Sequence, residues 1–366
     1  MRLEARPQVS RGWLVSAPFV AVAVTLLLTA LLLKWAGAPV GEAFGLLIQG
    51  AFGSRFALSE TLTRATPLIL TGLAAAVAFR ARLFNIGAEG QLYLGALAAV
   101  AVGGQHPEGL WAPLAQLPLP VLQAVMVGAA ALAGAVWLLL PALLKSRLGV
   151  DEVVTTLLLN FVALLLVSML LDGVMKDPMA MGWPQSVALQ PELEYGRLLE
   201  RTRLHNGLLW AIGLAVLLWV VDRYTTLGLS MRAVGANKEA AAFAGLPVQR
   251  TVIVVALISG ALAGLAGVGE VAGRTSYVTL DMSPGYGYAG IVIAMLAGLH
   301  PLGVVAAAVF VAAVLVGADS MSRTLGVPNV LADVVVALAL LSILVTALFA
   351  RYRIVWRQHH QRVGAA

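Results

Sequence analysis

Apolar blocks long enough to form membrane helices recur along almost the whole chain. Hydrophobic residues make up 60% of the 366 positions, whereas charged residues make up only 11%. A soluble domain carries about 25% charged residues, so this chain cannot cover a surface that faces water. The blocks are too long for barrel strands, which alternate over about 10 residues. We therefore predict an all-α integral membrane protein.

A membrane helix needs about 20 mainly apolar residues, because the hydrocarbon layer is about 30 Å thick. About ten segments are candidate spans on this criterion. Some are short, and short apolar segments are typical of discontinuous helices in transporters. The first segment could be a secretory signal, but its apolar core is too long and Pro39 follows the expected cleavage site. The candidates are 14–33, 66–79, 86–104, 119–140, 152–171, 206–221, 251–272, 288–299, 302–318 and 330–349.

The distribution of Lys and Arg predicts the orientation, because these residues accumulate on the cytoplasmic side. If the N-terminus lies inside, most of the 24 Lys and Arg residues are cytoplasmic, and so are both termini. The net charge of +6 is scattered between apolar blocks, which argues against nucleic-acid binding. We expect one transmembrane domain over 1–366, an external amphipathic stretch over 34–65, an outer loop over 172–205 and a cytoplasmic loop over 222–250.

A short helix is predicted within the cytoplasmic loop. Asn237 is a good N-cap, Glu239 lies in the first turn, Gly245 fits the position after the last turn, and Pro247 prevents continuation. A helix of about two turns is unstable alone in water. Its alanine face and Phe243 therefore need a surface to pack on, either the protein's own helices or a partner protein.

An acidic residue enters a membrane segment in the sequence Phe84–Gln91. Glu89 lies beside glycines there, and an ionisable group at such depth is costly and is a functional candidate by default. If the chain breaks near Asn85, the Asn85 and Gln91 amides could donate hydrogen bonds to the Glu89 carboxylate. The alternative is a simple ion pair between Glu89 and Arg80 or Arg82 near the membrane surface.

A second polar set lies on the segment 152–171. Asn160 follows Glu152 by two helical turns, which places it about 12 Å into the layer. A buried amide there needs a partner, and we favour a neighbouring helix over a ligand. Thr156 lies on the same helix face. In 251–272, Gly260 and Gly264 should let two helices approach closely.

The remaining polar residues are assigned simpler roles. Glu270, Asp319 and Asp333 fall near span ends, so we expect them to be solvated at the outer face. The five His residues show no ligand spacing with acidic residues, and no metal site is predicted. The chain has no Cys and no GxxxxGK[ST] run, so we expect no thiol chemistry and no ATP hydrolysis by this chain.

Several stretches together resemble the bacterial ABC importer permeases for simple sugars, nucleosides and basic-membrane-protein-type lipoprotein systems. Residues 84–91 resemble the NIGAEGQ signature of that family, and 150–160 resemble its EV.TT...N segment, which is followed by the Lys-Asp-Pro element at 176–178. Residues 228–245 resemble its EAA-type cytoplasmic loop, and 290–303 its GI..A.L.G..PLG segment. The length and outer loop resemble the larger permease of nucleoside systems.

This resemblance implies a type II permease fold with discontinuous helices, as in cobalamin and ribose permeases. It implies a substrate pathway that includes Asn85, Glu89, Gln91, Thr156 and Asn160. It also implies an ATPase-coupling helix that includes Asn237, Glu239, Ala240, Phe243 and Gly245. The implied partners are a cytoplasmic ABC ATPase, a second homologous permease in a heterodimer, an external solute-binding lipoprotein and the lipids of the bacterial inner membrane.

The function expected from the sequence is ATP-driven import of nucleosides or related small polar solutes, without a cofactor and without enzymatic chemistry. Ribose-like sugars are the second substrate class, and branched-chain amino acids are the third. An ion-coupled secondary transporter is an alternative mechanism, in which Glu89 and Glu270 would be coupling groups. An intramembrane enzyme is disfavoured, because the spans contain no plausible Ser/His pair or metal-ligand cluster.

Overall fold

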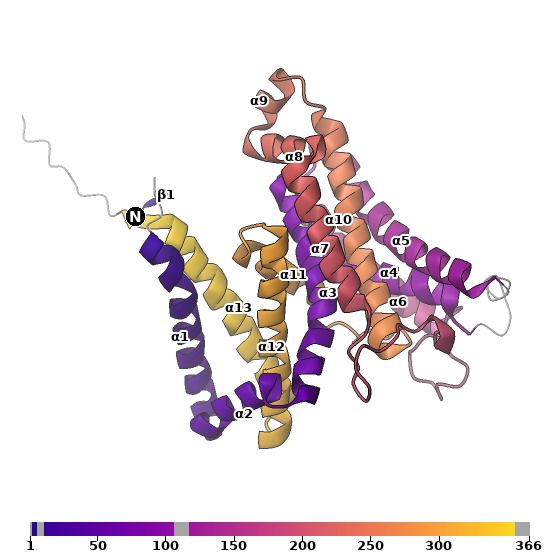
Figure 1. The fold of residues 1–366 in the computed structure, drawn as a ribbon, viewed down its shortest axis with the longest axis vertical. Helices are drawn as coiled ribbons and strands as arrows, with labels where there is room; N and C mark the ends of the chain where they lie inside the picture. Colours follow the sequence, from indigo (N-terminus) through magenta and orange to yellow (C-terminus); the bar gives the residue numbers. More distant parts are fainter. Residues whose placement is uncertain (1, 6–10, 106–116, 356–366) are drawn as a thin grey trace, which may run out of the picture. The chain divides into compact units, whose positions relative to one another are not determined.

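The computed structural model describes residues 2–5, 11–105 and 117–355. The chain forms two compact units, which are described separately below. One unit combines Met1–Leu46 with Ala318–Ala366, and the other comprises Leu47–Gly317. Both are built from helices (Figure 1). Whether they act as one transmembrane domain over 1–366 stays a prediction.

The smaller unit is built around two long helices that pack on each other, α1 (Arg11–Trp35) and α13 (Asn329–Arg351). It also contains the start of α2 (Val40–Phe52) and the end of α12 (Pro301–Leu325). Two short strands, β1 (Arg2–Ala5) and β2 (Tyr352–Val355), pair antiparallel. The buried core of the unit is Leu33, Ala43, Met321 and Val335.

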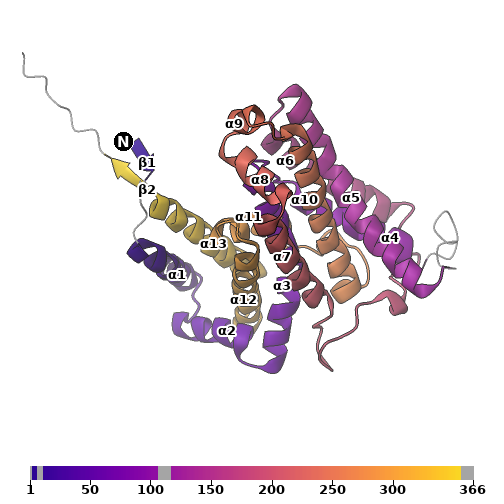
Figure 2. The ribbon, with the colours of Figure 1, turned by 45° about the horizontal axis from the view of Figure 1, so that its top comes forward.

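The larger unit is a bundle in which α10 packs against α3, α4 and α5. Figure 2 shows α8 and α9 together at one end of this bundle, which we call the α9 end. The loop 173–206 lies at the opposite end, which we call the loop end. The unit includes the end of α2 and most of α12. Its other helices are α3 (Arg55–Arg80), α4 (Ala88–Gly103), α5 (Leu119–Leu148), α6 (Glu152–Asp172), α7 (Gly207–Tyr224), α8 (Thr226–Ala236), α9 (Lys238–Phe243), α10 (Val248–Glu270) and α11 (Tyr286–Leu296), with a 3-10 turn at Pro191–Leu193 and a π-helical turn at Val271–Thr275.

Every predicted apolar segment falls on a helix. In the part of the chain that the structure describes, six helices are long and apolar enough to span a membrane. Shorter apolar helices include α2, α4 and α11. The chain is therefore a helical membrane protein, and the expected number of about ten spans stays a prediction.

The expected surface stretch over 34–65 is wrong from Arg55 onward. Residues from Arg55 onward belong to α3, a helix of 26 residues, so the segment 66–79 is not a short span. The Ser54 side chain caps this helix by accepting a hydrogen bond from the Ala57 N–H at 3.0 Å. The Thr61 hydroxyl donates to the Ala51 carbonyl at 2.9 Å. These local bonds extend the helix through a polar sequence that hydropathy alone assigns to the surface.

The loop 173–206 folds back onto the bundle instead of projecting freely. The Tyr195 N–H donates to the Ala272 carbonyl at 2.7 Å, which ties the loop to the π-helical turn that follows α10. His205 is buried, and burial lowers its pKa to about 4. The ring is therefore neutral at neutral pH, and it packs so closely that a Cβ on Gly273 would lie 2.3 Å from its Nε2. The loop 173–206, which corresponds to the predicted outer loop, is thus held to the bundle through Tyr195 and His205.

Glycines let α5 and α10 pack backbone against backbone. A Cβ on Gly134 of α5 would lie 2.2 Å from the Gly260 carbonyl oxygen, and one on Gly264 would lie 2.2 Å from the Ala130 carbonyl oxygen. Real Cβ atoms essentially never lie so close to another atom, so neither position accepts a side chain without a shift of one helix. The close approach predicted for Gly260 and Gly264 is confirmed.

Gly134→Ala should destabilise the bundle by roughly 1–3 kcal/mol, because the added methyl group forces the two backbones apart. Thermal unfolding of the purified protein in detergent measures this change. Gly128→Ala is the matched control, since nothing lies within 4 Å of a Cβ there and alanine favours the same helix. A Gly134→Ala protein with an unfolding midpoint as high as that of the control would contradict the packing argument.

Candidate functional site

The chain is interrupted between α3 and α4, inside the bundle. Helix α3 ends at Arg80 and α4 begins at Ala88, and the residues between them are not α-helical. The Asn85 and Gln91 amides donate to each other's carbonyl oxygens, both at 2.9 Å. Asn85 also donates to the Ser259 hydroxyl of α10 at 3.1 Å. The predicted break is confirmed, but these two amides bond to each other and not to Glu89.

One face of α6 supplies hydrogen bonds to the interrupted segment. The Phe84 N–H donates to the Glu152 carboxylate, and the Ile86 N–H donates to the Thr156 hydroxyl, both at 3.2 Å. Glu152 and Thr156 are one helical turn apart. Since α-helical bonding is lost over 81–87, these side chains replace part of it. We call Glu152, Thr156 and Asn160 the α6 ladder.

Asn160 completes the α6 ladder one turn further along. Its Oδ1 accepts the Gly90 N–H at 2.8 Å, and its Nδ2 donates to the Ile86 carbonyl at 2.9 Å and to the Tyr288 hydroxyl at 3.1 Å. The residue is completely buried. Its amide therefore joins α6, the interrupted segment and α11, which is the interhelical role favoured from the sequence.

A second helix, α11, also begins inside the bundle. The Thr71 hydroxyl, well inside α3, donates to the Tyr286 carbonyl at 2.9 Å. The other end of α11 leads to Leu299, whose carbonyl accepts a hydrogen bond from Arg80 at 2.8 Å at the α9 end. Helix α4 runs the other way, because Gly104 after its last turn pairs with Leu189 of the loop 173–206. Helices α4 and α11 thus extend from the interior toward opposite ends of the bundle.

The first turns of α4 and α11 meet at Glu89. The Gly287 N–H of α11 donates to the Glu89 carboxylate at 2.6 Å, and the Ser283 side chain bonds to the same carboxylate. A Cβ on Gly287 would lie 2.2 Å from the Glu89 backbone nitrogen, so the two turns are in direct contact. Helix N-termini carry partial positive charge, which the carboxylate offsets. We call this contact the α4–α11 junction.

The alternative in which Glu89 pairs with an arginine is wrong. Arg80 instead forms an ion pair with Asp222 of α7. Glu89 is 4% exposed, and its hydrogen-bond partners Ser283, Gly285 and Gly287 lie at or just before the start of α11. The structure therefore places Glu89 in the interior of the bundle, at the place where two interrupted helices face each other.

Glu270 is also buried, which corrects the expectation that it is solvated. It is 2% exposed and forms an ion pair with Arg274. Arg274 also donates to the Tyr286 hydroxyl at 3.3 Å. The helix continues past Glu270 through the π-helical turn Val271–Thr275, three residues beyond the expected end of the span. Arg274 follows Glu270 by four residues, so the two side chains lie on the same face of this helical turn.

At the α9 end, the predicted short helix is present as α9. The Asn237 side chain accepts the Ala240 N–H at 2.9 Å, and Gly245 has a φ of +81°. Ala241 is buried, whereas Phe243 is 96% exposed. Part of the alanine face therefore packs within the bundle, whereas the Phe243 side chain does not pack on it.

Sequence reasoning missed Asp222 as a buried, ion-paired residue. The residue lies at the start of the predicted cytoplasmic loop, where acids beside arginines are normally solvated, and was therefore not singled out. The structure buries it between Arg80 and Arg232. A sequence signal existed, because Asp222 directly follows an apolar span, but its partner Arg80 lies 142 residues away in the chain.

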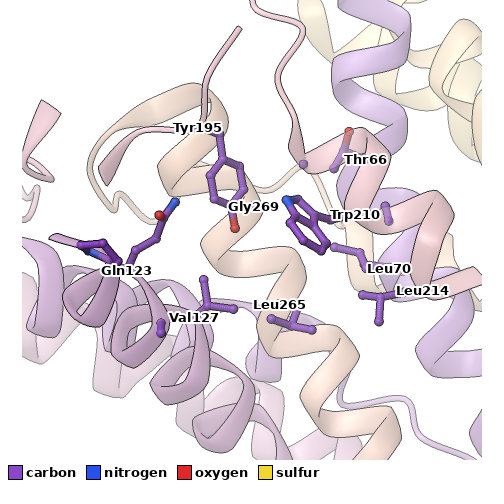
Figure 3. Close-up of a pocket in the computed structure, with 13 residues that line it drawn as sticks. Thr66, Leu70, Gln123, Val127, Tyr195, Trp210, Leu214, Leu265 and Gly269 are labelled. Atoms are coloured by element: carbon purple, nitrogen blue, oxygen red, sulfur yellow. The ribbon is translucent and has the colours of Figure 1, made fainter. Parts of the chain in front are cut away.

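A cavity of about 530 Å³ lies between α3, α5, α7 and α10 near the loop end (Figure 3). Tyr195 and Gln123 point into it, and Trp210 borders it. Leu70, Val127, Leu214 and Leu265 make much of the remaining wall. A solute with several hydroxyl groups would leave most of them unpaired here, which is costly. More hydrogen-bonding side chains lie at and beside the α4–α11 junction than line this cavity.

Comparison with known proteins identifies the family. The family described as "Branched-chain amino acid transport system / permease component" matches residues 57–344, which include both interrupted helices, the α6 ladder and α9. The chain belongs to this permease family. It is thus a transport permease of ABC systems and not an enzyme. Permeases of this kind work with an ATPase and a solute-binding protein.

Several characterised permeases are similar over most of their length. The guanosine ABC transporter permease protein NupP of Bacillus subtilis is 36% identical over 328 residues, which cover 88% of this chain and 91% of that protein. The glucose ABC transporter permease protein TsgB13 of Haloferax volcanii is 38% identical over 86% of this chain and 82% of its own. The nucleoside ABC transporter permease protein NupB of Lactococcus lactis is 30% identical over 88% of each.

Glu89→Gln should lower substrate uptake by about tenfold, because a neutral amide offsets the two helix N-termini less well than a carboxylate. Uptake by cells that express equal amounts of assembled permease measures the effect. Arg82→Gln is the control, because the Arg82 side chain is exposed. The Lys145 ammonium donates to the backbone carbonyl of Arg82, and the substitution leaves that carbonyl in place. Similar, small losses in both variants would show that the Glu89 charge does not contribute to the pathway.

Proposed function

We propose that this permease is the membrane subunit of an ATP-driven importer for nucleosides. The observation that carries the proposal is the similarity to the guanosine permease NupP over nearly the full length of both chains. Similarity to NupB, a nucleoside permease, supports the same substrate class. The glucose permease TsgB13 is comparably similar, so simple sugars are the second candidate.

In this proposal the α4–α11 junction is part of the substrate pathway. Asn85, Gln91, Thr156 and Asn160 surround it and have their hydrogen bonds satisfied in the conformation described. A nucleoside carries hydroxyl and ring nitrogen groups that could replace such bonds. Substrate passage would then exchange internal hydrogen bonds for bonds to the solute, which lowers the cost of opening the interior.

The α9 end is proposed to face the cytoplasm and to receive the ATPase. The nearly full exposure of Phe243 supports this, because a large apolar side chain on an isolated short helix suits a groove on a partner. The opposite end, with the loop 173–206, would face the solute-binding lipoprotein. The setting proposed is the bacterial inner membrane, with both termini cytoplasmic and a second homologous permease completing the pathway.

Transport by the complete complex tests the substrate class. Proteoliposomes that contain the permease complex, its ATPase and its binding protein should accumulate labelled guanosine only when ATP reaches the ATPase. Excess unlabelled nucleoside should suppress the signal, whereas glucose and leucine should not. Suppression by glucose alone would assign the sugar alternative, and accumulation driven by an ion gradient without ATP would support a secondary transporter.

Gly245→Val should reduce the amount of nucleoside transported per ATP hydrolysed by about tenfold. A β-branched residue resists the positive φ at this position, so the end of α9 should shift away from its docking surface. Glu239→Lys should act in the same direction, because the new charge opposes the helix dipole. The measurement is the ratio of uptake to ATP hydrolysis in proteoliposomes.

Gly149→Val controls for backbone strain in general. Gly149 ends α5 with a φ of +69°, and nothing lies within 4 Å of a Cβ there, as at Gly245. The two variants therefore carry similar local strain, but only Gly245 belongs to the proposed coupling element. Equal transport ratios in the two variants would argue against a coupling role for α9.

A further inference from the structure

Asp222 joins three helices at the α9 end of the bundle. The residue lies near the end of α7 and forms ion pairs with Arg80 at the end of α3 and with Arg232 of α8. Arg232 also donates to the Asp222 backbone carbonyl. The Asp222 side chain is 12% exposed and that of Arg80 is 17% exposed. Removing one partner from such a pair would strand a largely buried charge.

Arg80 extends this cluster to a fourth element. Its Nη2 donates at 2.8 Å to the Leu299 carbonyl, in the turn between α11 and α12. Gly298 and Leu299 both have positive φ values, +59° and +62°, so this turn is tight and has little freedom to adjust. The Asp222–Arg80 pair thereby fixes the end of α11 that lies opposite the α4–α11 junction.

Helix α8 also contacts the ends of α3 and α7 through its glycines. A Cβ on Gly235 would lie 2.0 Å from the Arg80 carbonyl oxygen, and one on Gly228 would lie 2.3 Å from the Asp222 carbonyl oxygen. Helix α8 is therefore held at both ends by backbone contact and at Arg232 by charge. Because α9 follows α8 after the single residue Asn237, a displacement of α9 must move α8 as well.

The contacts that run from α9 through α8 and Asp222 to Arg80 end at the interrupted segment. Arg80 is the last residue of α3, and the segment 81–87 starts directly after it. That segment leads to Glu89, and Leu299 leads through α11 to Gly287, so both sides of the junction connect to Arg80. A shift of Arg80 by way of Asp222 therefore reaches the junction from two directions.

We propose that Asp222 is a positioning residue that locks α8 to the ends of α3 and α11, so that movement of α9 is transmitted to the α4–α11 junction. The inference rests on the proposed function, because it needs an ATPase that moves α9. Asp222 touches no substrate in this view. Its charge holds α3, α7 and α8 together, and Arg80 is the residue that it positions.

The test compares Asp222→Asn with Arg223→Gln in the complete complex in proteoliposomes. Arg223 is the next residue on the same helix and is exposed, with no ion pair among those of the described residues. Asp222→Asn should lower uptake per ATP hydrolysed by at least about fivefold, whereas Arg223→Gln should stay near the wild-type ratio. The double variant Arg80→Gln/Asp222→Asn should be no worse than Asp222→Asn alone, because the two residues act as a pair.

Hydrogen exchange distinguishes a role of Asp222 in transmitting the movement of α9 from a role in stabilising the fold alone. In the wild-type complex, ATP should change the exchange rates of the amides in 81–87, and Asp222→Asn should abolish that change. An unchanged ATP response in Asp222→Asn, with only a lower yield of folded complex, would overturn the proposal. A wild-type complex that hydrolyses ATP but imports no nucleoside would refute the proposed function instead, and the exchange measurement would still test Asp222.

Discussion

The backbone groups freed at the break between α3 and α4 must be satisfied within the protein, because hydrocarbon offers them no hydrogen bonds. The α6 ladder meets this requirement by presenting Glu152, Thr156 and Asn160 to the segment on successive helical turns. The Asn85–Gln91 amide pair closes the same loop on itself. The break is thus a defined structure, and its position is set by side chains of a neighbouring helix.

The α4–α11 junction follows from this arrangement. Two helix N-termini in contact would repel each other, since both carry partial positive charge. Glu89 lies in the first turn of α4 and accepts the Gly287 N–H of α11, so one carboxylate serves both termini. The absence of a side chain on Gly287 permits the contact. An ionisable residue within the bundle is therefore explained by the helix ends that it joins.

The sequence predicted those features that depend on neighbours along the chain. Helix α9 is an example, because the Asn237 cap and the positive φ of Gly245 are local properties. The sequence also selected Asn160 correctly as a buried amide. Long-range partners could not be predicted, as Asp222 shows, because it pairs with Arg80, 142 residues away in the chain. The burial of Glu270 was also missed, because it depends on how the helices pack and not on its neighbours in the sequence. Hydropathy likewise missed the first turns of α3.

The glycine contacts indicate where the bundle can change shape. Helix α4 packs on α10 through Gly95, and α10 packs on α5, so these three helices should move together. Helix α11 packs on α3 through Gly290, where a Cβ would lie 2.7 Å from the Thr71 backbone. The two groups meet at the α4–α11 junction and also where α10 packs on α3, where the Ser259 hydroxyl donates to the Ala74 carbonyl at 2.8 Å. Because a hydrogen bond depends on both distance and angle, a relative shift of the groups must strain the Glu89–Gly287 bond together with the Ser259–Ala74 bond, whereas the backbone contacts within each group can persist.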